Sequence, residues 1–290
     1  MKRLLVLALV PAMLACSGNE DRDAPATGGP AAGVTTPETT VAPTTAAPTT
    51  LAPTTTEAPV EPITVLVTND DGIGAGGIDA VVNALATLDW VEVVIVAPAE
   101  NQSGTSDSTS PNAPASGPAT TASGVEGVAV QGFPADSVLL ALDELGVTPD
   151  LVVSGINAGQ NIGPFVELSG TVGAARTAAR RGIPALAASA GLATGGEPDY
   201  ATVAELVLDW FAENQEALLT GTLPVAVTSI NAPTCAPGTE LRGVVEVPVA
   251  VAFPEGVDPF ATDCASTLEA PADDAAALAN GFASISDPGF

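Results

Sequence analysis

Two adjacent carboxylates stand at the end of a short apolar run, in the sequence N-D-D-G at residues 69–72. The run before them, I-T-V-L-V-T, is rich in apolar and β-branched residues, which is typical of a strand buried on both faces. Asp70 and Asp71 repel each other unless a positive charge lies between them, and a hard divalent cation prefers oxygen ligands. The pattern therefore indicates a cation site, with a polar turn closed by Gly72 as the alternative.

Two further polar clusters follow the next predicted strands: N-Q-S-G at residues 101–104 and S-G-I-N-A-G-Q-N at residues 154–161. The carboxyl ends of parallel strands emerge on the same edge of a sheet, so these clusters are expected to share a crevice with the two carboxylates. Ser103 and Asn157 then add neutral oxygen ligands, which suit Mg²⁺ or Mn²⁺ better than zinc. The predicted ligands of this single cation are Asp70, Asp71, Ser103 and Asn157.

The sequence S-G-T at residues 169–171 precedes an alanine-rich segment that is expected to be a helix ending near Arg181. A helix N-terminus with a glycine offers unpaired N–H groups and a partial positive charge, which together bind a phosphate. An ordinary N-cap by the serine is the alternative. Because the cation site is expected on the same edge, we favour the phosphate site. The residues predicted to hold it are Asn161, Ser169, Gly170 and Thr171.

Strand and helix patterns alternate along the chain with short connections, which predicts a parallel sheet with right-handed crossovers. The fold class is therefore α/β, a doubly wound, Rossmann-like and mostly parallel sheet. Strands are expected within residues 63–68, 91–96, 125–130, 150–153, 183–187 and 224–230, and helices within 78–88, 138–145, 171–181 and 200–218.

Two stretches of the expected domain lack this regular alternation. Residues 100–121 are polar and aperiodic, which predicts a long functional or disordered loop. Residues 232–290 are rich in Pro and are expected to form a less regular C-terminal extension that ends in a helix at 272–278 and a strand at 282–285.

The beginning of the chain carries an export pattern. Lys2 and Arg3 precede an apolar run at residues 4–10, and M-L-A-C ends at Cys16, which is typical of a bacterial lipoprotein signal. The run is too short to span a bilayer. We therefore expect a signal peptide at 1–15 and lipidation of Cys16. Simple secretion and an uncleaved anchor are the alternatives, and the expected location is the cell envelope, at the outer face of a membrane, or the medium.

Residues 16–62 consist largely of Pro, Thr, Ala and Gly, which bury too little apolar surface to fold, so a disordered tether is expected before a folded domain at 63–290. The formal net charge of −27 makes nucleic-acid polymers poor partners, and a membrane is expected to be contacted only through the lipid anchor. Cys235 and Cys264 are expected to form a disulfide in an exported protein, with two free thiols as the alternative.

Charged groups limit the chemistry further. The sequence contains no His, which excludes a His general base, a Ser-His-Asp triad and most zinc or copper sites. Arg176, Arg180 and Arg181 are expected to act on the C-terminal end of their helix or to form ion pairs, rather than to contact a ligand.

Six motifs, in order along the chain, resemble the SurE nucleotidase family. They are V-T-N-D-D-G-I at 67–73, S-G at 103–104, G-F-P-A-D-S-V at 132–138, V-S-G-I-N-A-G-Q-N at 153–161, S-G-T-V-G-A-A-R at 169–176 and S-I-N-A-P at 229–233. The resemblance implies cation ligation by Asp70, Asp71, Ser103 and Asn157. Family members usually carry His where this chain has Asp107 and Thr where it has Phe133, and they pair their subunits through an arm that residues 237–262 do not resemble.

The resemblance implies a divalent-metal-dependent phosphomonoesterase, a 5′-nucleotidase that converts nucleoside monophosphates to nucleoside and phosphate, with a homodimer as the expected assembly. Asp70 and Asp71 are the expected catalytic residues, since no His is present to accept a proton. Two alternatives use the same crevice. One is a non-catalytic envelope lipoprotein that captures nucleotides or phosphate, which normally has two lobes; the other is a decayed enzyme kept as an interaction module.

Overall fold

The computed structural model describes residues 61–290, apart from residues 194–195, 254 and 256–257. The predicted signal peptide, Cys16 and the tether up to residue 60 lie outside the described residues. Within the described part, no helix is long and apolar enough to cross a membrane.

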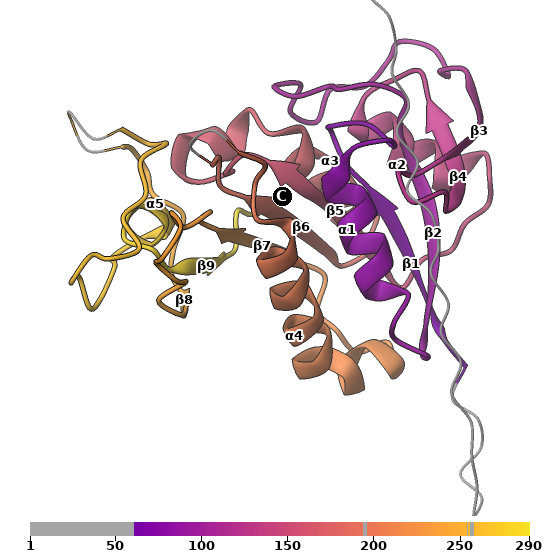
Figure 1. The fold of residues 1–290 in the computed structure, drawn as a ribbon. Coiled ribbons are helices and arrows are strands. Elements are labelled where there is room, and N and C mark those ends of the chain that lie inside the picture. The colour runs from indigo at the N-terminus through magenta and orange to yellow at the C-terminus, as the bar shows by residue number, and fades with distance from the viewer. Residues whose placement is uncertain (1–60, 194–195, 254, 256–257) are drawn as a thin grey trace, which may run out of the picture. The chain divides into compact units, whose positions relative to one another are not determined.

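A nine-stranded sheet runs through the described residues (Figure 1). Its strands are parallel except that β3 is antiparallel to β4 and β9 is antiparallel to β7. In spatial order the strands are β3 (Ser116–Thr120), β4 (Glu126–Val130), β2 (Val91–Pro98), β1 (Ile63–Thr68), β5 (Leu151–Ala158), β6 (Ala185–Ala190), β7 (Val227–Ala232), β9 (Ala283–Ser286) and β8 (Val244–Glu246).

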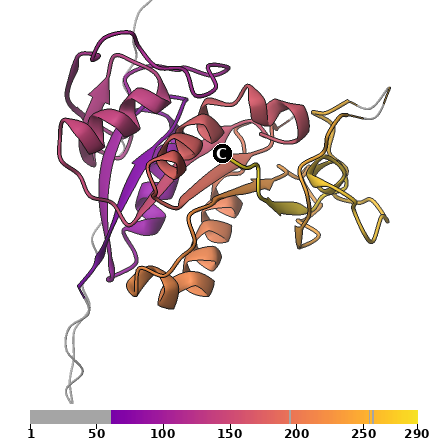
Figure 2. The same cartoon turned by 180° about the vertical axis from the view of Figure 1, so that it is seen from behind.

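Helices cover both faces of this sheet. The helices α1 (Gly76–Leu85) and α4 (Tyr200–Leu219) pack together on the face seen in Figure 1. The helices α2 (Pro134–Asp143) and α3 (Gly170–Arg180) pack together on the opposite face, seen in Figure 2. The 3₁₀ helix η1 (Gly163–Glu167) precedes α3, and the short α5 (Asp274–Ala279) lies in the C-terminal extension.

The central strand β1 contributes to both cores, as its apolar run predicts. Val65 and Val67 belong to the core under α1 and α4, whereas Leu66 belongs to the core under α2 and α3. All three side chains are fully buried. Period-two alternation thus sends neighbouring residues to opposite faces, which is why the strand is apolar at nearly every position.

Local signals fix where the helices begin. Pro134 opens α2, where its missing N–H costs nothing. The side chains of Ser169 and Asp199 cap α3 and α4 by accepting hydrogen bonds from Val172 N and Thr202 N, respectively. The N-terminus of α3 lies beside the carboxyl end of β1, where Gly170 contacts Asp70.

The connection β6–α4–β7 has an unusual hand. The steps β5 to β6 and β6 to β7 run in the same direction across the sheet, yet α3 and α4 lie on opposite faces, so their crossovers have opposite hands. The connections β1–α1–β2 and β5–α3–β6 have the same hand. Because crossovers are almost always right-handed, we take these two as right-handed, and β6–α4–β7 is then the left-handed exception. As a result Tyr200, at the start of α4, lies against Gly76 at the start of α1.

The predicted α/β doubly wound fold with a less regular C-terminal extension is confirmed. The prediction of a loop through residues 100–121 is wrong at its end, because residues 116–120 form β3. The β8 strand and η1 were also not predicted. Both β3 and β8 are short edge strands that form only by pairing with a neighbour, so neither carries a periodic apolar signal of its own.

Candidate metal and phosphate site

A cavity of about 330 Å³ lies at the carboxyl ends of β1 and β5. These two strands are neighbours, and the chain winds from β1 to β2 on one side and from β5 to β6 on the other. This is the topological switch point, where open α/β sheets bind their ligands. The polar clusters predicted to converge do so: the cavity is lined by Asp70, Ser103, Asn157, Asn161 and Ser169.

Asp70 is the buried carboxylate of the site, with an exposed fraction of 2%. Its Oδ1 accepts a hydrogen bond from Thr171 Oγ1 at 2.7 Å. The helix α3 approaches this closely because residue 170 is Gly: a Cβ there would lie 2.8 Å from the Cβ of Asp70. Burial raises the pKa of Asp70 to about 6, the bond from Thr171 opposes this rise, and the charge of Asp71 adds to it.

Asp71 lies nearer the surface and is held from two sides. Its Oδ1 accepts a hydrogen bond from Asn101 Nδ2 at 2.9 Å, and its Oδ2 accepts one from the backbone N–H of Ala158 at 2.8 Å. Burial raises the pKa of Asp71, and these two bonds lower it again in part. The carboxylate is therefore tied to the segments after β2 and at the end of β5, the two neighbours of β1.

No basic side chain among the described residues pairs with Asp70 or Asp71. The described part of the chain contains only four cationic residues, all arginines, and each is engaged elsewhere. Arg176 pairs with Glu167, Arg180 with Asp107 and Arg181 with Asp143, while Arg242 binds the carbonyls of Leu268 and Asn280. The ion pairs expected for the α3 arginines are thus present. Two partly desolvated carboxylates that pair with none of these four arginines fit an added positive ion.

The neutral donors complete an oxygen-rich set. Asn157 Nδ2 donates to the carbonyl of Gly159 at 2.6 Å, which leaves its Oδ1 without a donor among the described residues. Ser103 brings a hydroxyl to the same cavity. The described residues hold no cluster of three or more His, Cys, Asp or Glu side chains. Two carboxylates, an amide oxygen and a hydroxyl therefore suit Mg²⁺ or Mn²⁺ and not a thiolate or imidazole metal.

Of the residues predicted to bind phosphate, Ser169 caps α3, whereas Thr171 and Asn161 belong to a hydrogen-bond network around Asp70. Ser169 lines the cavity, but its hydroxyl accepts from Val172 N at 3.0 Å, so the side chain acts as the N-cap that was the alternative prediction. Thr171 is fully buried and orients Asp70. Asn161 Nδ2 donates to Thr171 Oγ1 and, at 2.9 Å, to Ser189 Oγ. Thr171 and Asn161 thus position the carboxylate, and a direct phosphate contact stays a prediction for the N-terminus of α3.

The sequence patterns did not identify the apolar side of the cavity. Phe165, Leu168, Leu192 and Phe260 line it together with the polar residues. Phe260 comes from the Pro-rich extension, where no periodicity marks it. Its large apolar side chain among polar and small residues was the only available signal.

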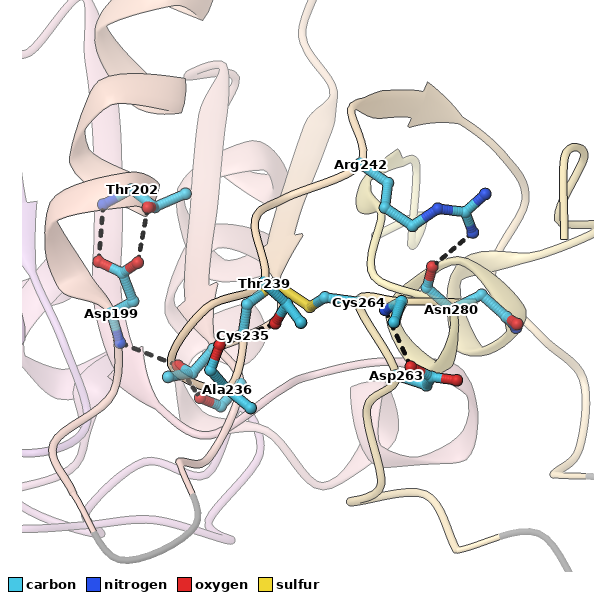
Figure 3. The surroundings of a disulfide bond; sticks show 12 residues. Asp199, Thr202, Cys235, Ala236, Thr239, Arg242, Asp263, Cys264 and Asn280 are labelled. Atoms are coloured by element: carbon cyan, nitrogen blue, oxygen red, sulfur yellow. Dashed lines mark hydrogen bonds between the residues drawn. A yellow bond between two sulfur atoms is a disulfide. The ribbon is translucent and has the colours of Figure 1, made fainter. Parts of the chain in front are cut away.

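A disulfide joins Cys235, after β7, to Cys264, before α5, as Figure 3 shows. Next to it, Arg242 donates to the carbonyl of Asn280 at 2.9 Å and lies over the ring of Phe282, 4.4 Å from its centroid. These contacts fix the irregular extension to the edge of the sheet.

The fold and the site define a doubly wound α/β protein whose switch-point crevice combines paired carboxylates with a helix N-terminus. Residues 65–250 match the family described as Survival protein SurE, and the chain belongs to that family.

Similar proteins agree with this assignment. A protein named 5′-nucleotidase SurE from Methanospirillum hungatei is 47% identical over 126 residues, which cover 43% of this chain and 44% of that protein. A protein named 5′-nucleotidase SurE 1 from Burkholderia lata is 48% identical over 127 residues, covering 43% and 48%. The chain thus spans about half the length of the curated relatives it matches. The crystal structure of the SurE protein from Aquifex aeolicus matches with a TM-score of 0.61 and 28% identity, over 78% of this chain and 93% of that one.

Proposed function

We propose that this chain is a divalent-metal-dependent phosphomonoesterase that hydrolyses nucleoside monophosphates to nucleoside and phosphate, as a 5′-nucleotidase. The observation that carries the proposal is the pair Asp70 and Asp71 at the switch point, beside the N-terminus of α3. Among the described residues, neither carboxylate pairs with a cationic side chain. A phosphate dianion next to two carboxylates requires positive charge. The four described arginines are engaged elsewhere, so among the described residues the N-terminus of α3 is the source of positive charge beside the carboxylates, and its charge is only partial.

Asp70, Asp71, Ser103 and Asn157 are the residues that would hold the cation. When bound, a divalent cation supplies positive charge that offsets charge developing on the phosphoryl oxygens and acidifies a water molecule. We assign Mg²⁺ or Mn²⁺ because the donors are all oxygen atoms.

The chain's own residues perform the remaining tasks. Thr171 fixes one oxygen of Asp70 while the carboxylate faces the cavity, and Asn101 and the Ala158 N–H fix both oxygens of Asp71. We assign the proton acceptor for the attacking water to this pair of carboxylates, since the sequence holds no His. The backbone N–H groups at the start of α3 would hold the non-bridging phosphoryl oxygens.

The location and assembly of the protein are part of the proposal. Export with a lipid on Cys16 would place the phosphatase domain outside the cell on a long tether, and a homodimer would follow the family. The supports for these are the sequence pattern at residues 1–16 and the family relationship.

The proposed activity is tested by phosphate release from a panel of nucleoside monophosphates, in EDTA and after addition of Mg²⁺ or Mn²⁺. We expect release only with the cation. Asp71→Asn keeps an acceptor for the Ala158 N–H but removes one negative charge, so kcat/KM should fall about 100-fold or more even at saturating cation. Its thermal stability in EDTA should stay level or rise, because a like-charge repulsion is relieved.

A matched control is Asp209→Asn, which removes one negative charge from an exposed position on α4. It should keep wild-type activity. If Asp71→Asn is as active as the wild type, or the wild type is equally active in EDTA, the two carboxylates form only a polar turn and the proposal is wrong.

A further inference from the structure

An exposed apolar wall adjoins the polar end of the cavity. Leu168, Leu192 and Phe260 line this cavity together with Asp70, and their exposed fractions are 60%, 47% and 52%. Exposed apolar side chains that gather around one concave site, rather than singly, are typical of a ligand-binding groove. The cavity therefore has two chemically distinct parts, one suited to an anion held by a cation and one suited to an apolar group.

Aromatic packing gives this wall a defined surface. The ring of Phe260 stacks on that of Phe165, with 5.4 Å between centroids and 27° between planes. Phe165 in turn packs against Phe253, with 4.8 Å between centroids. Phe260 is thus supported by a neighbouring ring while half of its surface remains open to the cavity and solvent.

A buried glutamine holds this wall next to the polar cluster. Gln160 Nε2 donates to the carbonyl of Pro259 at 2.7 Å, and its Oε1 accepts from the backbone N–H of Leu192 at 3.2 Å. Its exposed fraction is only 5%. One side chain from the segment after β5 therefore fixes the positions of two wall residues, Phe260 and Leu192, which come from distant parts of the chain.

We infer that Phe260 is a specificity-determining residue that stacks on the base of a nucleoside monophosphate while the phosphate lies at Asp70 and Asn157. This inference rests on the proposed function and names the part of the substrate that the C-terminal extension recognises. Every nucleobase offers a π-face to an aromatic side chain, and such stacking is worth about 1–3 kcal/mol per base in single-strand binding. The wall side chains Phe165, Leu168, Leu192 and Phe260 are hydrocarbon, so they favour a base over no base without selecting one base by hydrogen bonds.

Phe260 lies outside the residues matched by the family, which end at 250. The Cys235–Cys264 disulfide holds the extension that carries Phe260 against the edge of the sheet.

The test compares wild type, Phe260→Ala and Phe260→Trp in the presence of Mg²⁺ or Mn²⁺. The ligands are a purine and a pyrimidine nucleoside monophosphate, and ribose 5-phosphate, which lacks the base, used as substrate or as competing ligand. Phe260→Ala should raise KM for both nucleotides about tenfold, which corresponds to about 1.4 kcal/mol, with little change in kcat. The affinity for ribose 5-phosphate should not change, and Phe260→Trp should restore the wild-type KM. Phe290→Ala removes a phenylalanine of similar exposure that does not line the cavity, and it should behave as wild type.

The possible results separate the inference from the function on which it rests. If the wild type hydrolyses nucleotides and Phe260→Ala has an unchanged KM, the inference is overturned and the proposed function stands. Equal losses for nucleotides and ribose 5-phosphate would show a structural role for Phe260 and would also overturn it. If the wild type releases no phosphate from any substrate, the proposed function fails first and the inference fails with it.

Discussion

Asp70 should destabilise the metal-free protein above its own pKa, and Asp70→Asn should remove this effect. The carboxyl group is buried, its pKa is raised to about 6, and no cation among the described residues compensates its charge. Asn has the same shape, and its oxygen still accepts the hydrogen bond from Thr171 Oγ1. The substitution therefore removes the charge while the local packing is kept.

The size of the effect follows from proton linkage. The unfolded chain loses this proton near the ordinary value of 3.8, whereas the folded protein keeps it until about pH 6. Because the pKa is raised in the folded protein, the proton on Asp70 stabilises the fold. This contribution is fully present below pH 3.8 and is lost as the pH rises through about 6. The difference corresponds to about 3 kcal/mol of unfolding free energy. For a domain of this size that equals roughly 6–12 °C in Tm.

The assay is urea and thermal unfolding of wild type and Asp70→Asn in EDTA between pH 4 and pH 7.5. We expect the stability of the variant relative to wild type to rise by most of about 3 kcal/mol across this range. Part of the pH dependence should remain in the variant, because burial also raises the pKa of Asp71. Asp209→Asn, which changes the net charge equally from an exposed site, should run parallel to wild type.

A divalent cation should remove most of this difference in stability. At about 100 times its Kd, a cation that binds only the folded wild type adds about 2.7 kcal/mol, and the variant should gain much less. If the difference between the two proteins is independent of pH, the pKa of Asp70 is not raised in the folded protein. If the wild type gains nothing from Mg²⁺ or Mn²⁺, the cation site is wrong.

Two further predictions concern the cysteines. Replacing Cys235 and Cys264 together by Ser opens a loop that the disulfide closes across 29 residues. The unfolding free energy, measured by urea unfolding under oxidising conditions, should fall by about 3 kcal/mol. A variant as stable as wild type would contradict this. Cys16→Ala should abolish labelling by a fatty-acid analogue in the host cell, while wild type is labelled and stays with the membrane; equal release of both proteins into the medium would show that no lipid anchors the chain.

The sequence patterns predicted the interior of the sheet well and its edges poorly, for one physical reason. A buried strand such as β1 must be apolar on both faces, so its residues alone reveal it. The edge strand β3, with the sequence S-G-P-A-T, has alternating exposure and forms because it pairs with β4. Its tendency to be extended comes from the neighbour and not from its own residues.

The same distinction holds for the site. Asp70, Ser103 and Asn157 were predicted to meet because topology alone brings the carboxyl ends of parallel strands to one edge. The bond from Thr171 to Asp70, and the engagement of Asn161 by Thr171 and Ser189, depend on how closely α3 packs on the β1 loop. No spacing along the chain encodes that distance, so the sequence patterns did not predict these hydrogen bonds.

The distribution of arginines explains why substrate and cation must bind together in the proposed enzyme. Each of the four described arginines is engaged outside the cavity, whereas Asp70 lines its polar end and Asp71 follows it directly in the chain. A phosphate dianion alone would meet net repulsion there, and a bound cation turns that repulsion into attraction. By thermodynamic linkage the coupling is reciprocal, so a nucleotide must raise cation affinity by the same factor as the cation raises nucleotide affinity. In the proposed enzyme, the phosphate site would thereby stay closed to anions until the cation is bound.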